Sequence, residues 1–366
     1  MRIINVVGAR PNFMKIAPVI RAMNVYKDQI NHMLVHTGQH YDEKMSQSFF
    51  NDLGLPEPDL DLGVGSGSQA EQTACVMVGF EKVCEDVKPD IVVVVGDVNS
   101  TMACAITAKK CNIHVAHIEA GLRSRDMTMP EEINRIVTDS LSDSLFVTER
   151  SGVANLRAEG KPEDAIHFVG NVMVDTLYHQ VAALDATQIS LGKPPIPYAV
   201  LTLHRPGNVD DENKCREIMG AILEISRDLP VYFPVHPRTK KMMENSGQER
   251  ELSGQSVHFL PPLPYREFLY LWKDAALVLT DSGGLQEETT ALGVPCFTIR
   301  ENTERPITIE EGTNTLVGTS HEDILAAFDD FKKNGSKRGR VPALWDGNAS
   351  ERIVSILLEK RFKKSI

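Results

Sequence analysis

Several features that mark common protein classes are absent from this chain of 366 residues. No apolar run approaches the roughly 20 residues that a membrane-spanning helix needs. Basic residues gather only in short clusters such as KRGR at 337–340, and 39 Lys and Arg against 50 Asp and Glu leave a net charge of −11. Because nucleic acids and anionic membranes attract basic surfaces, we expect neither to be a partner of this protein.

Sequence motifs for cofactors are also missing. A nicotinamide cofactor requires G-x-G-x-x-G directly after a strand, but the nearest match, GVGSGS at 63–68, has Ser68 in place of the third glycine. No G-x-x-x-x-G-K-[ST] motif is present, which disfavours a kinase or an ATPase. His114 and His117 stand three apart on an expected strand and so on opposite faces, which excludes a metal shared between them. We predict that the protein uses neither a cofactor nor a metal.

The cysteines show no C-x-x-C pairing, and the chain begins with a strand pattern instead of a charged and then apolar leader. We therefore expect reduced thiols and a cytoplasmic location. The six cysteines are Cys75, Cys84, Cys104, Cys111, Cys215 and Cys296.

The apolar pattern predicts two α/β domains. Short, nearly continuous apolar runs alternate with segments of helical periodicity, as in parallel sheets covered by helices on both faces. One series fills residues 1–183, a loose stretch rich in Pro, Gly and Ser follows, and a second series fills 198–347. We predict two Rossmann-like, doubly wound domains that face a cleft. Ligands of such sheets bind beyond the carboxyl ends of the strands, so polar residues at those ends are the functional candidates.

Cations follow the first strand of the first domain. The stretch VVGARPNFMK places Arg10 and Lys15 around the start of a helix. Cations at such a turn suit an anion held by the helix N-terminus. Equally, Arg10 could cap local carbonyls and Lys15 could be a solvated helix residue.

Acids end the later strands of the same domain. Each could be a helix cap or a complement to a helix dipole when it is taken alone. Three acids converging on one crevice would shift one another's pKa values, which is how a site obtains both an acid and a base near neutral pH. Asp97 follows VVVVG and Glu119 follows VAHI, and MPEEINR adds Glu131, Glu132 and Arg135 where a helix begins.

Histidines end two strands of the second domain. His204 closes LTLH and is followed by Arg205, while His236 closes FPVH. A lone histidine is more often structural than catalytic, but two histidines at equivalent strand ends favour a functional role.

The stretch TDSGGLQEE at 280–288 gives the strongest single signal. Ser282, Gly283 and Gly284 follow a strand and begin a helix, where small residues let a pyrophosphate approach free backbone N–H groups. A carboxylate one turn later, at Glu288, could accept hydrogen bonds from sugar hydroxyls beyond the phosphates. Glu287 is interpreted as a helix-start residue that favours the dipole.

Taken together, these blocks resemble the non-hydrolysing UDP-N-acetylglucosamine 2-epimerases of bacteria and archaea. The resemblance runs from residue 1 to about 310 and implies the two-domain glycosyltransferase-B architecture. It also implies a C-terminal helix, at about 348–366, that packs back on the first domain, and a homodimer. The blocks that carry it are GARPNFMK, GD, EAGLRS, MPEEINR, LHR, SGGLQEE and ENTERP, in this order.

The resemblance also implies roles for individual residues. Arg10 and Lys15 look like substrate-binding cations, and His204 like the strand-end histidine that contacts the diphosphate and sugar. Asp97, Glu119 and Glu131 are similar to the essential acids, with Arg135 beside them. On the nucleotide side, the matching residues are Ser282, Gly283 and Gly284 for the diphosphate, Glu288 for the ribose, Arg305 for the phosphates and Phe268 for the uracil.

The implied activity is interconversion of UDP-N-acetylglucosamine and UDP-N-acetylmannosamine through elimination of UDP. The stretch VHTGQHYDEKMSQSFF at 35–50 also resembles a subgroup that includes 2-epimerases of UDP-2,3-diacetamido-2,3-dideoxy-glucuronic acid, which is the alternative substrate. A hydrolysing epimerase, a glycosyltransferase and a non-catalytic nucleotide-sugar binder are weaker alternatives. Where better-known members read HRREN, this chain reads HRPGN, and the replaced Arg and Glu belong to the region where a second, activating UDP-sugar binds.

Overall fold

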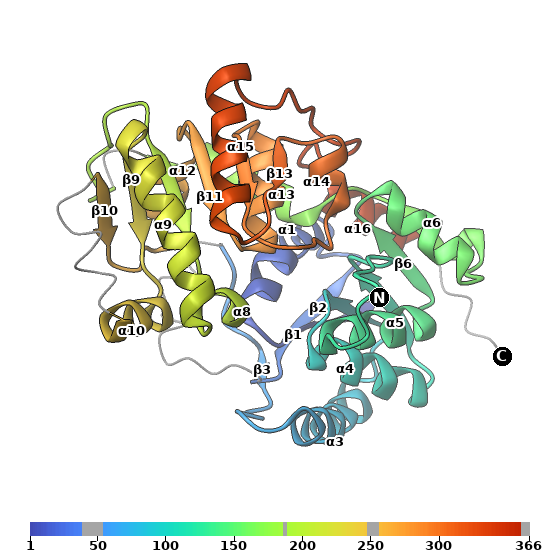
Figure 1. Ribbon diagram of the computed structural model, residues 1–366. Helices are drawn as coiled ribbons and strands as arrows, with labels where there is room; N and C mark the ends of the chain where they lie inside the picture. Colours follow the sequence, from blue (N-terminus) through green and yellow to red (C-terminus); the bar gives the residue numbers. More distant parts are fainter. Residues whose placement is uncertain (39–53, 186–188, 247–255, 360–366) are drawn as a thin grey trace. The chain divides into compact units, whose positions relative to one another are not determined.

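The chain forms two compact units, each built around one parallel sheet (Figure 1). The computed structural model describes residues 1–38, 54–185, 189–246 and 256–359. Unit 1 comprises Met1–His179 and Ala343–Ile366, and unit 2 comprises Gln180–Pro342. The predicted α/β class with two doubly wound sheets is confirmed. Within the described ranges, no helix is both long and apolar enough to span a bilayer.

The sheet of unit 1 has seven strands, and every neighbouring pair is parallel. Strand order runs outward from the centre in both directions, so the topological switch point lies between β1 and β4. In spatial order the strands are β3 (Leu60–Asp61), β2 (Asn31–His36), β1 (Arg2–Val7), β4 (Ile91–Val95), β5 (His114–Ile118), β6 (Ser144–Val147) and β7 (Ile166–Phe168).

Helices bury both faces of this sheet. Alternate residues of a strand point to opposite faces, so Ile3 and Val93 join the core under α1 (Arg10–Val25) and α16 (Ala349–Glu359). Ile4 and Val92 join the core under α3 (Gln69–Val87) and α4 (Asn99–Lys110). The remaining helices of this part of the chain are α5 (Pro130–Leu141), α6 (Arg150–Ala158), a 3₁₀ turn (Glu163–Ala165) and α7 (Val172–Ala182).

The C-terminal helix α16 belongs to unit 1 and packs against α1. Asp175 caps it, because the carboxylate accepts the N–H groups of Ala349 (3.1 Å) and Ser350 (2.7 Å). Just before the helix, the buried Trp345 donates its indole N–H to the carbonyl of Thr148 (3.0 Å). These contacts tie the end of the chain to the first domain's core.

Unit 2 repeats the architecture with six parallel strands, and its switch point lies between β8 and β11. Helices α9 and α15 bury one face of the sheet. The strands, in spatial order, are β10 (Val257–Leu260), β9 (Val231–Pro234), β8 (Ala199–Thr202), β11 (Leu277–Thr280), β12 (Cys296–Thr298) and β13 (Asn314–Leu316). The helices are α8 (Pro206–Val209), α9 (Glu212–Asp228), α10 (Pro237–Ser246), α12 (Tyr265–Trp272), α13 (Gly283–Leu292), α14 (Pro306–Glu310) and α15 (His321–Asn334).

Candidate active site

The acids of unit 1 lie at the carboxyl ends of two neighbouring strands. Val95 of β4 pairs with Ile118 of β5, so the next residues, Gly96 and Glu119, leave the sheet side by side. Asp97 follows Gly96 directly. Ligands of doubly wound sheets bind at this edge, so the strand register brings two of the predicted acids to the expected position.

A buried ion pair joins Lys15 of α1 to Glu119. Lys15 Nζ lies 2.5 Å from Glu119 Oε2, and both side chains are almost fully buried. Gly96 packs over this pair, since a Cβ added there would lie only 3.2 Å from Lys15 Nζ and 3.6 Å from Glu119 Oε2. Lys15 is therefore not a solvated helix residue, because it holds the carboxylate of Glu119 in a site from which water is excluded.

Glu119 adopts a left-handed backbone conformation with φ of 70°. Such a conformation is strained for a residue with a side chain and costs on the order of 1–3 kcal/mol, which surrounding contacts must offset. The ion pair with Lys15 is one such contact, and the hydrogen bond from Ala120 N to Phe146 O (3.1 Å) is another. A strained residue that carries a buried charge at a strand end is typical of a functional site.

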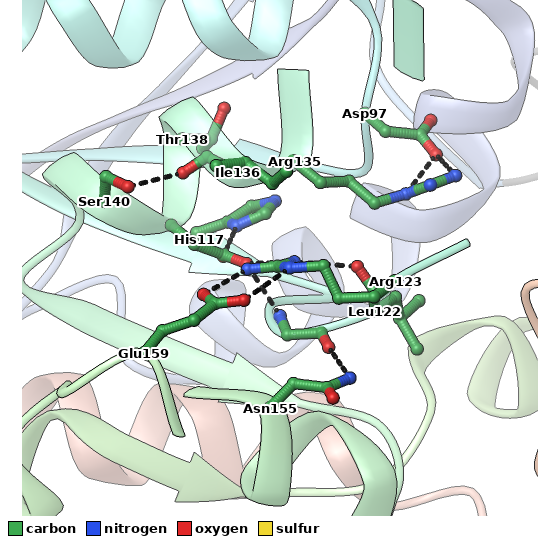
Figure 2. A network of polar contacts seen from close by, with 12 residues as sticks. Asp97, His117, Leu122, Arg123, Arg135, Ile136, Thr138, Ser140, Asn155 and Glu159 are labelled. Atoms are coloured by element: carbon green, nitrogen blue, oxygen red, sulfur yellow. Dashed lines mark hydrogen bonds and ion pairs between the residues drawn. The ribbon is translucent and has the colours of Figure 1, made fainter. Parts of the chain in front are cut away.

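Arg135 of α5 holds Asp97 (Figure 2). Its Nε and Nη2 donate to Asp97 Oδ2 at 3.0 and 2.6 Å, and its Nη1 donates to Glu132 Oε2 at 2.7 Å. Glu132 in turn accepts the backbone N–H groups of Ser124 and Arg125, so it fastens the loop that follows Glu119. Burial raises the pKa of Glu132, but these hydrogen bonds and Arg135 outweigh it and lower the pKa overall.

Two other predicted residues of unit 1 are exposed. Glu131 lies in the first turn of α5, one turn before Arg135 and on the same face of the helix. Arg10 is the first residue of α1, the helix that carries Lys15. Their exposure suits groups that contact a ligand.

Asp281 organises the switch point of unit 2, although sequence reasoning gave it no role. It is fully buried after β11, and it accepts the backbone N–H groups of His204 (3.0 Å) and Arg205 (2.9 Å) from the loop after β8. His204 Nδ1 also lies 2.9 Å from Asp281. Burial raises the pKa of Asp281, yet the contacts with His204 and Arg205 lower it overall. The buried Asp281 thus orients the exposed imidazole of His204.

The predicted anion-binding turn forms as expected at the start of α13. Ser282 is the N-cap with an extended backbone and Gly283 begins the helix, with Gly284 next. A Cβ added at Gly283 would lie 2.7 Å from Glu304 Oε1, so any larger residue there would displace that carboxylate.

Glu304 gathers arginines beside this turn, and sequence reasoning missed it. Arg300 donates to Glu304 Oε2 at 2.9 Å, and Arg205 lies 3.7 Å from Oε1. Burial opposes the negative charge, but Arg305, Arg300 and Arg205 lower the pKa of Glu304 to about 2. The signal was present in the sequence only as the acidic residue between two cations in RENTER.

The two glutamates of α13 are buried and differ in their partners. Glu287 forms an ion pair with Arg305 (Oε1 to Nε, 2.9 Å), so its interpretation as a helix-start residue was wrong. Glu288 accepts the hydroxyl of Tyr265 at 2.5 Å. Burial, with Glu287 nearby, raises the pKa of Glu288 to about 7 despite the hydrogen bond from Tyr265. Glu288 therefore carries a proton for part of the time at neutral pH.

Phe268 and His236 complete the predicted set. Phe268 is half-buried on α12, three residues after Tyr265 and hence on the same helix face. His236 is exposed after β9 with its ring 6.3 Å from that of His204, and burial, together with His204, lowers its pKa. In the part of the chain that the structure describes, no three His, Cys, Asp or Glu side chains are placed to hold a metal ion.

Comparison with known proteins gives consistent results over nearly the whole chain. The family model described as UDP-N-acetylglucosamine 2-epimerase matches residues 23–358. A UDP-N-acetylglucosamine 2-epimerase from Methanocaldococcus jannaschii is 41% identical over 98% of this chain and 99% of its own length. A UDP-2,3-diacetamido-2,3-dideoxy-D-glucuronate 2-epimerase from Pseudomonas aeruginosa is 39% identical, again over 98% of this chain and 99% of its own length.

Solved structures agree with these matches. The M. jannaschii UDP-GlcNAc 2-epimerase in complex with UDP-GlcNAc and UDP superposes with a TM-score of 0.85 at 41% identity, covering 98% of this chain and 100% of its own. The Neisseria meningitidis UDP-GlcNAc 2-epimerase bound to UDP-GlcNAc superposes with a TM-score of 0.87 at 31% identity and the same coverage. The stretch at 35–50 that resembles the diacetamido subgroup lies, from residue 39 onward, outside the described residues.

The raised pKa of Glu288 predicts that the free energy of unfolding falls as the pH rises. The folded carboxyl keeps its proton up to about pH 7, while the unfolded one loses it near its ordinary value of 4.5. Between these values unfolding releases a proton, so this group should cost the fold about 2 kcal/mol between pH 5 and 7. Glu288→Gln should remove that slope. Urea unfolding followed by Trp272 fluorescence in a Trp345→Phe background measures it in unit 2, and equal slopes in both proteins would contradict the assignment.

The lowered pKa of Glu304 predicts that the free energy of unfolding falls as the pH decreases. Its folded pKa of about 2 lies below the ordinary value of 4.5, so its contribution to stability is present at neutral pH and is lost as the pH falls. Relative to Glu304→Gln, the wild type should lose about 1 kcal/mol between pH 7 and pH 4. The same fluorescence assay measures this difference. A gap between the two proteins that is constant with pH would show that Glu304 is not held ionised by its arginines.

Proposed function

This chain belongs to the UDP-N-acetylglucosamine 2-epimerase family, and we propose that it interconverts UDP-N-acetylglucosamine and UDP-N-acetylmannosamine. It is an isomerase of a UDP-sugar. The observation that carries this proposal is the pair of acids at strand ends of unit 1, Asp97 and Glu119. Each is held by a buried cation, and the SGG turn belongs to unit 2.

The chemistry of the sugar requires an indirect route. No ketone neighbours C2 of a 2-acetamido sugar, so its proton is not acidic enough for direct enolisation. We propose that the C1–O bond to UDP breaks while a base removes the C2 proton, which leaves a C1–C2 double bond. Protonation of C2 from the opposite face and attack of the UDP oxygen on C1 then give the epimer. Reactant and product have the same oxidation state, so the route needs no redox partner.

Unit 1 supplies acids and bases for this route. Proton exchange on two faces of C2 requires more than one group, and Asp97, Glu119 and Glu131 are the candidates. Arg135 fixes one oxygen of Asp97, and Lys15 fixes one oxygen of Glu119, so both carboxylates are oriented before the substrate arrives. Arg10, exposed beside them, is suited to the sugar's phosphate side.

Unit 2 supplies groups for the nucleotide. Negative charge develops on the diphosphate as it leaves, and the N–H groups at Ser282, Gly283 and Gly284 are suited to stabilise it. His204 and Arg305 are the cationic candidates for the same charge. Glu288 is the candidate for the ribose hydroxyls, and its partial protonation lets the carboxyl donate as well as accept. Phe268, on the Tyr265 face of α12, is the candidate for contact with uracil.

A second substrate is favoured by a specific observation. The relative from P. aeruginosa named for the diacetamido-glucuronate is 39% identical to this chain, against 41% for the M. jannaschii relative named for UDP-N-acetylglucosamine. We also propose a cytoplasmic homodimer, which light scattering after size exclusion would test.

Removing either paired acid should nearly abolish turnover. We expect Asp97→Asn and Glu119→Gln, and also Glu131→Gln, to lower kcat by a factor on the order of a hundred or more, because each removes a proton-transfer group. Glu85→Gln, on the exposed surface of α3, is the matched control and should retain full activity. Initial rates of epimerisation measure the effect. Near-normal rates in all three acid variants would refute the assignment.

Solvent exchange tests the reaction itself. Incubation with UDP-N-acetylglucosamine in D₂O should place deuterium at C2 while UDP stays attached to the sugar, because the C2 proton leaves during elimination. NMR detects both outcomes. Free sugar would indicate a hydrolysing epimerase, and absence of exchange would exclude this substrate. The same experiment with UDP-2,3-diacetamido-2,3-dideoxy-glucuronic acid decides between the two sugars.

A further inference from the structure

His117 is the last residue but one of β5, fully buried, and the proposed reaction does not use it. Its Nδ1 is 2.6 Å from Asp139 Oδ1, and its Nε2 is 2.9 Å from the carbonyl oxygen of Gly96. A carbonyl oxygen accepts only, and so does an ionised carboxylate. Through these two contacts His117 joins α5 to the loop after β4.

Asp139 extends this connection to the loop after β5. Its Oδ2 accepts the backbone N–H of Gly121 at 2.9 Å and lies 2.7 Å from Arg123 Nη1. Arg123 then makes two hydrogen bonds to Glu159, at 2.8 and 2.6 Å. Burial would keep Asp139 protonated, but His117 and Arg123 lower its pKa and keep it ionised. His117, Asp139, Arg123 and Glu159 thus form one chain of contacts.

The two backbone groups held by this chain flank the two acids. Gly96 comes directly before Asp97, and Gly121 comes two residues after Glu119. Three positions in these loops are left-handed, with φ of 71° at Gly96, 70° at Glu119 and 81° at Gly121. Such loops keep their shape only when contacts on several sides determine it. Gly121 is also pressed against Gly152, whose carbonyl oxygen would lie 2.4 Å from an added Cβ.

We infer that His117 and Asp139 are positioning residues that fix the separation of Asp97 and Glu119 by tying Gly96 to Gly121 beneath them. Neither residue touches the reacting atoms. The inference rests on the proposed function for its catalytic consequence, but not for its structural one. A buried ion pair is often replaceable by apolar residues without loss of stability. Here His117 and Asp139 each bind a backbone group of a loop that carries an acid. Apolar residues could not form these hydrogen bonds.

Kinetics test the catalytic consequence. His117→Asn keeps a donor for Asp139 but cannot reach Gly96, and Asp139→Asn places an amide among donors. Both should lower kcat by about 10- to 100-fold, as expected for misplacement of reacting groups by a fraction of an ångström to 1 Å. The KM and the affinity for UDP should stay within about threefold of wild type, because the nucleotide groups belong to unit 2. A purely structural role would lower the amount of folded enzyme without changing kcat per UDP-binding site.

Two further variants make the test specific. His114→Asn changes a histidine on the same strand that bonds Ser144, and it should retain wild-type kcat. Glu159→Gln acts at the outer, partly exposed end of the chain of contacts and should slow the enzyme by only about two- to fivefold, through the loosened Arg123. Wild-type kcat in His117→Asn, Asp139→Asn and Glu159→Gln would overturn the inference.

Amide hydrogen exchange tests the structural consequence without any substrate. Asp139 bonds Gly121 directly but reaches Gly96 only through His117. In Asp139→Asn, segments 96–99 and 119–125 should therefore lose protection together, while α1 and α16 keep theirs and show that unit 1 is folded. Unchanged protection at 96–99 would overturn the inference. If wild-type enzyme exchanged no C2 proton on either sugar, the proposed function would fail, and this measurement would still decide the positioning role.

Discussion

The buried ion pair between Lys15 and Glu119 is the constraint on which the site of unit 1 depends. It connects α1 to the end of β5 and crosses β4, the strand between β1 and β5. Removing charges from water costs several kcal/mol per ion, which is recovered only if both partners are present in good geometry. Gly96 packs on the pair, so the path of the loop that presents Asp97 also depends on it. The same ion pair therefore determines both the charge at this edge of the sheet and the path of its loop.

In unit 2 a different buried carboxylate, that of Asp281, holds the loop at the sheet edge. Asp281 binds backbone N–H groups of the loop after β8, as well as His204, and so it joins the two strands at the switch point. In unit 1 the equivalent edge carries acids, whereas in unit 2 it carries a histidine, arginines and a helix N-terminus. Two sheets with one topology thus present opposite chemistry.

The sequence was sufficient for features with a local cause. Apolar runs and Gly or Pro positions predicted both sheets and the helix that begins at Gly283, because burial and backbone freedom act within a few residues. It was insufficient where a partner lies far along the chain. Lys15 could have been solvated, and only the fold places it beside Glu119, 104 residues later. Glu287 looked like a dipole residue until Arg305 was found against it. Asp139 is an ordinary polar residue in its helix, and nothing local indicates its bond to His117.

The two glutamates after the SGG turn illustrate how a fold reconciles like charges with an anion site. A helix N-terminus gains from a negative ligand, and an unpaired carboxylate nearby would repel that ligand. The charge of Glu287 is matched by Arg305, and burial suppresses the charge of Glu288 by raising its pKa to about 7. Glu304, closer still to Gly283, stays ionised only because its arginines exceed it in charge. Arginines thus balance the charges of Glu287 and Glu304, and burial suppresses the charge of Glu288. The three carboxyl groups therefore leave the N-terminus of α13 favourable to an anion.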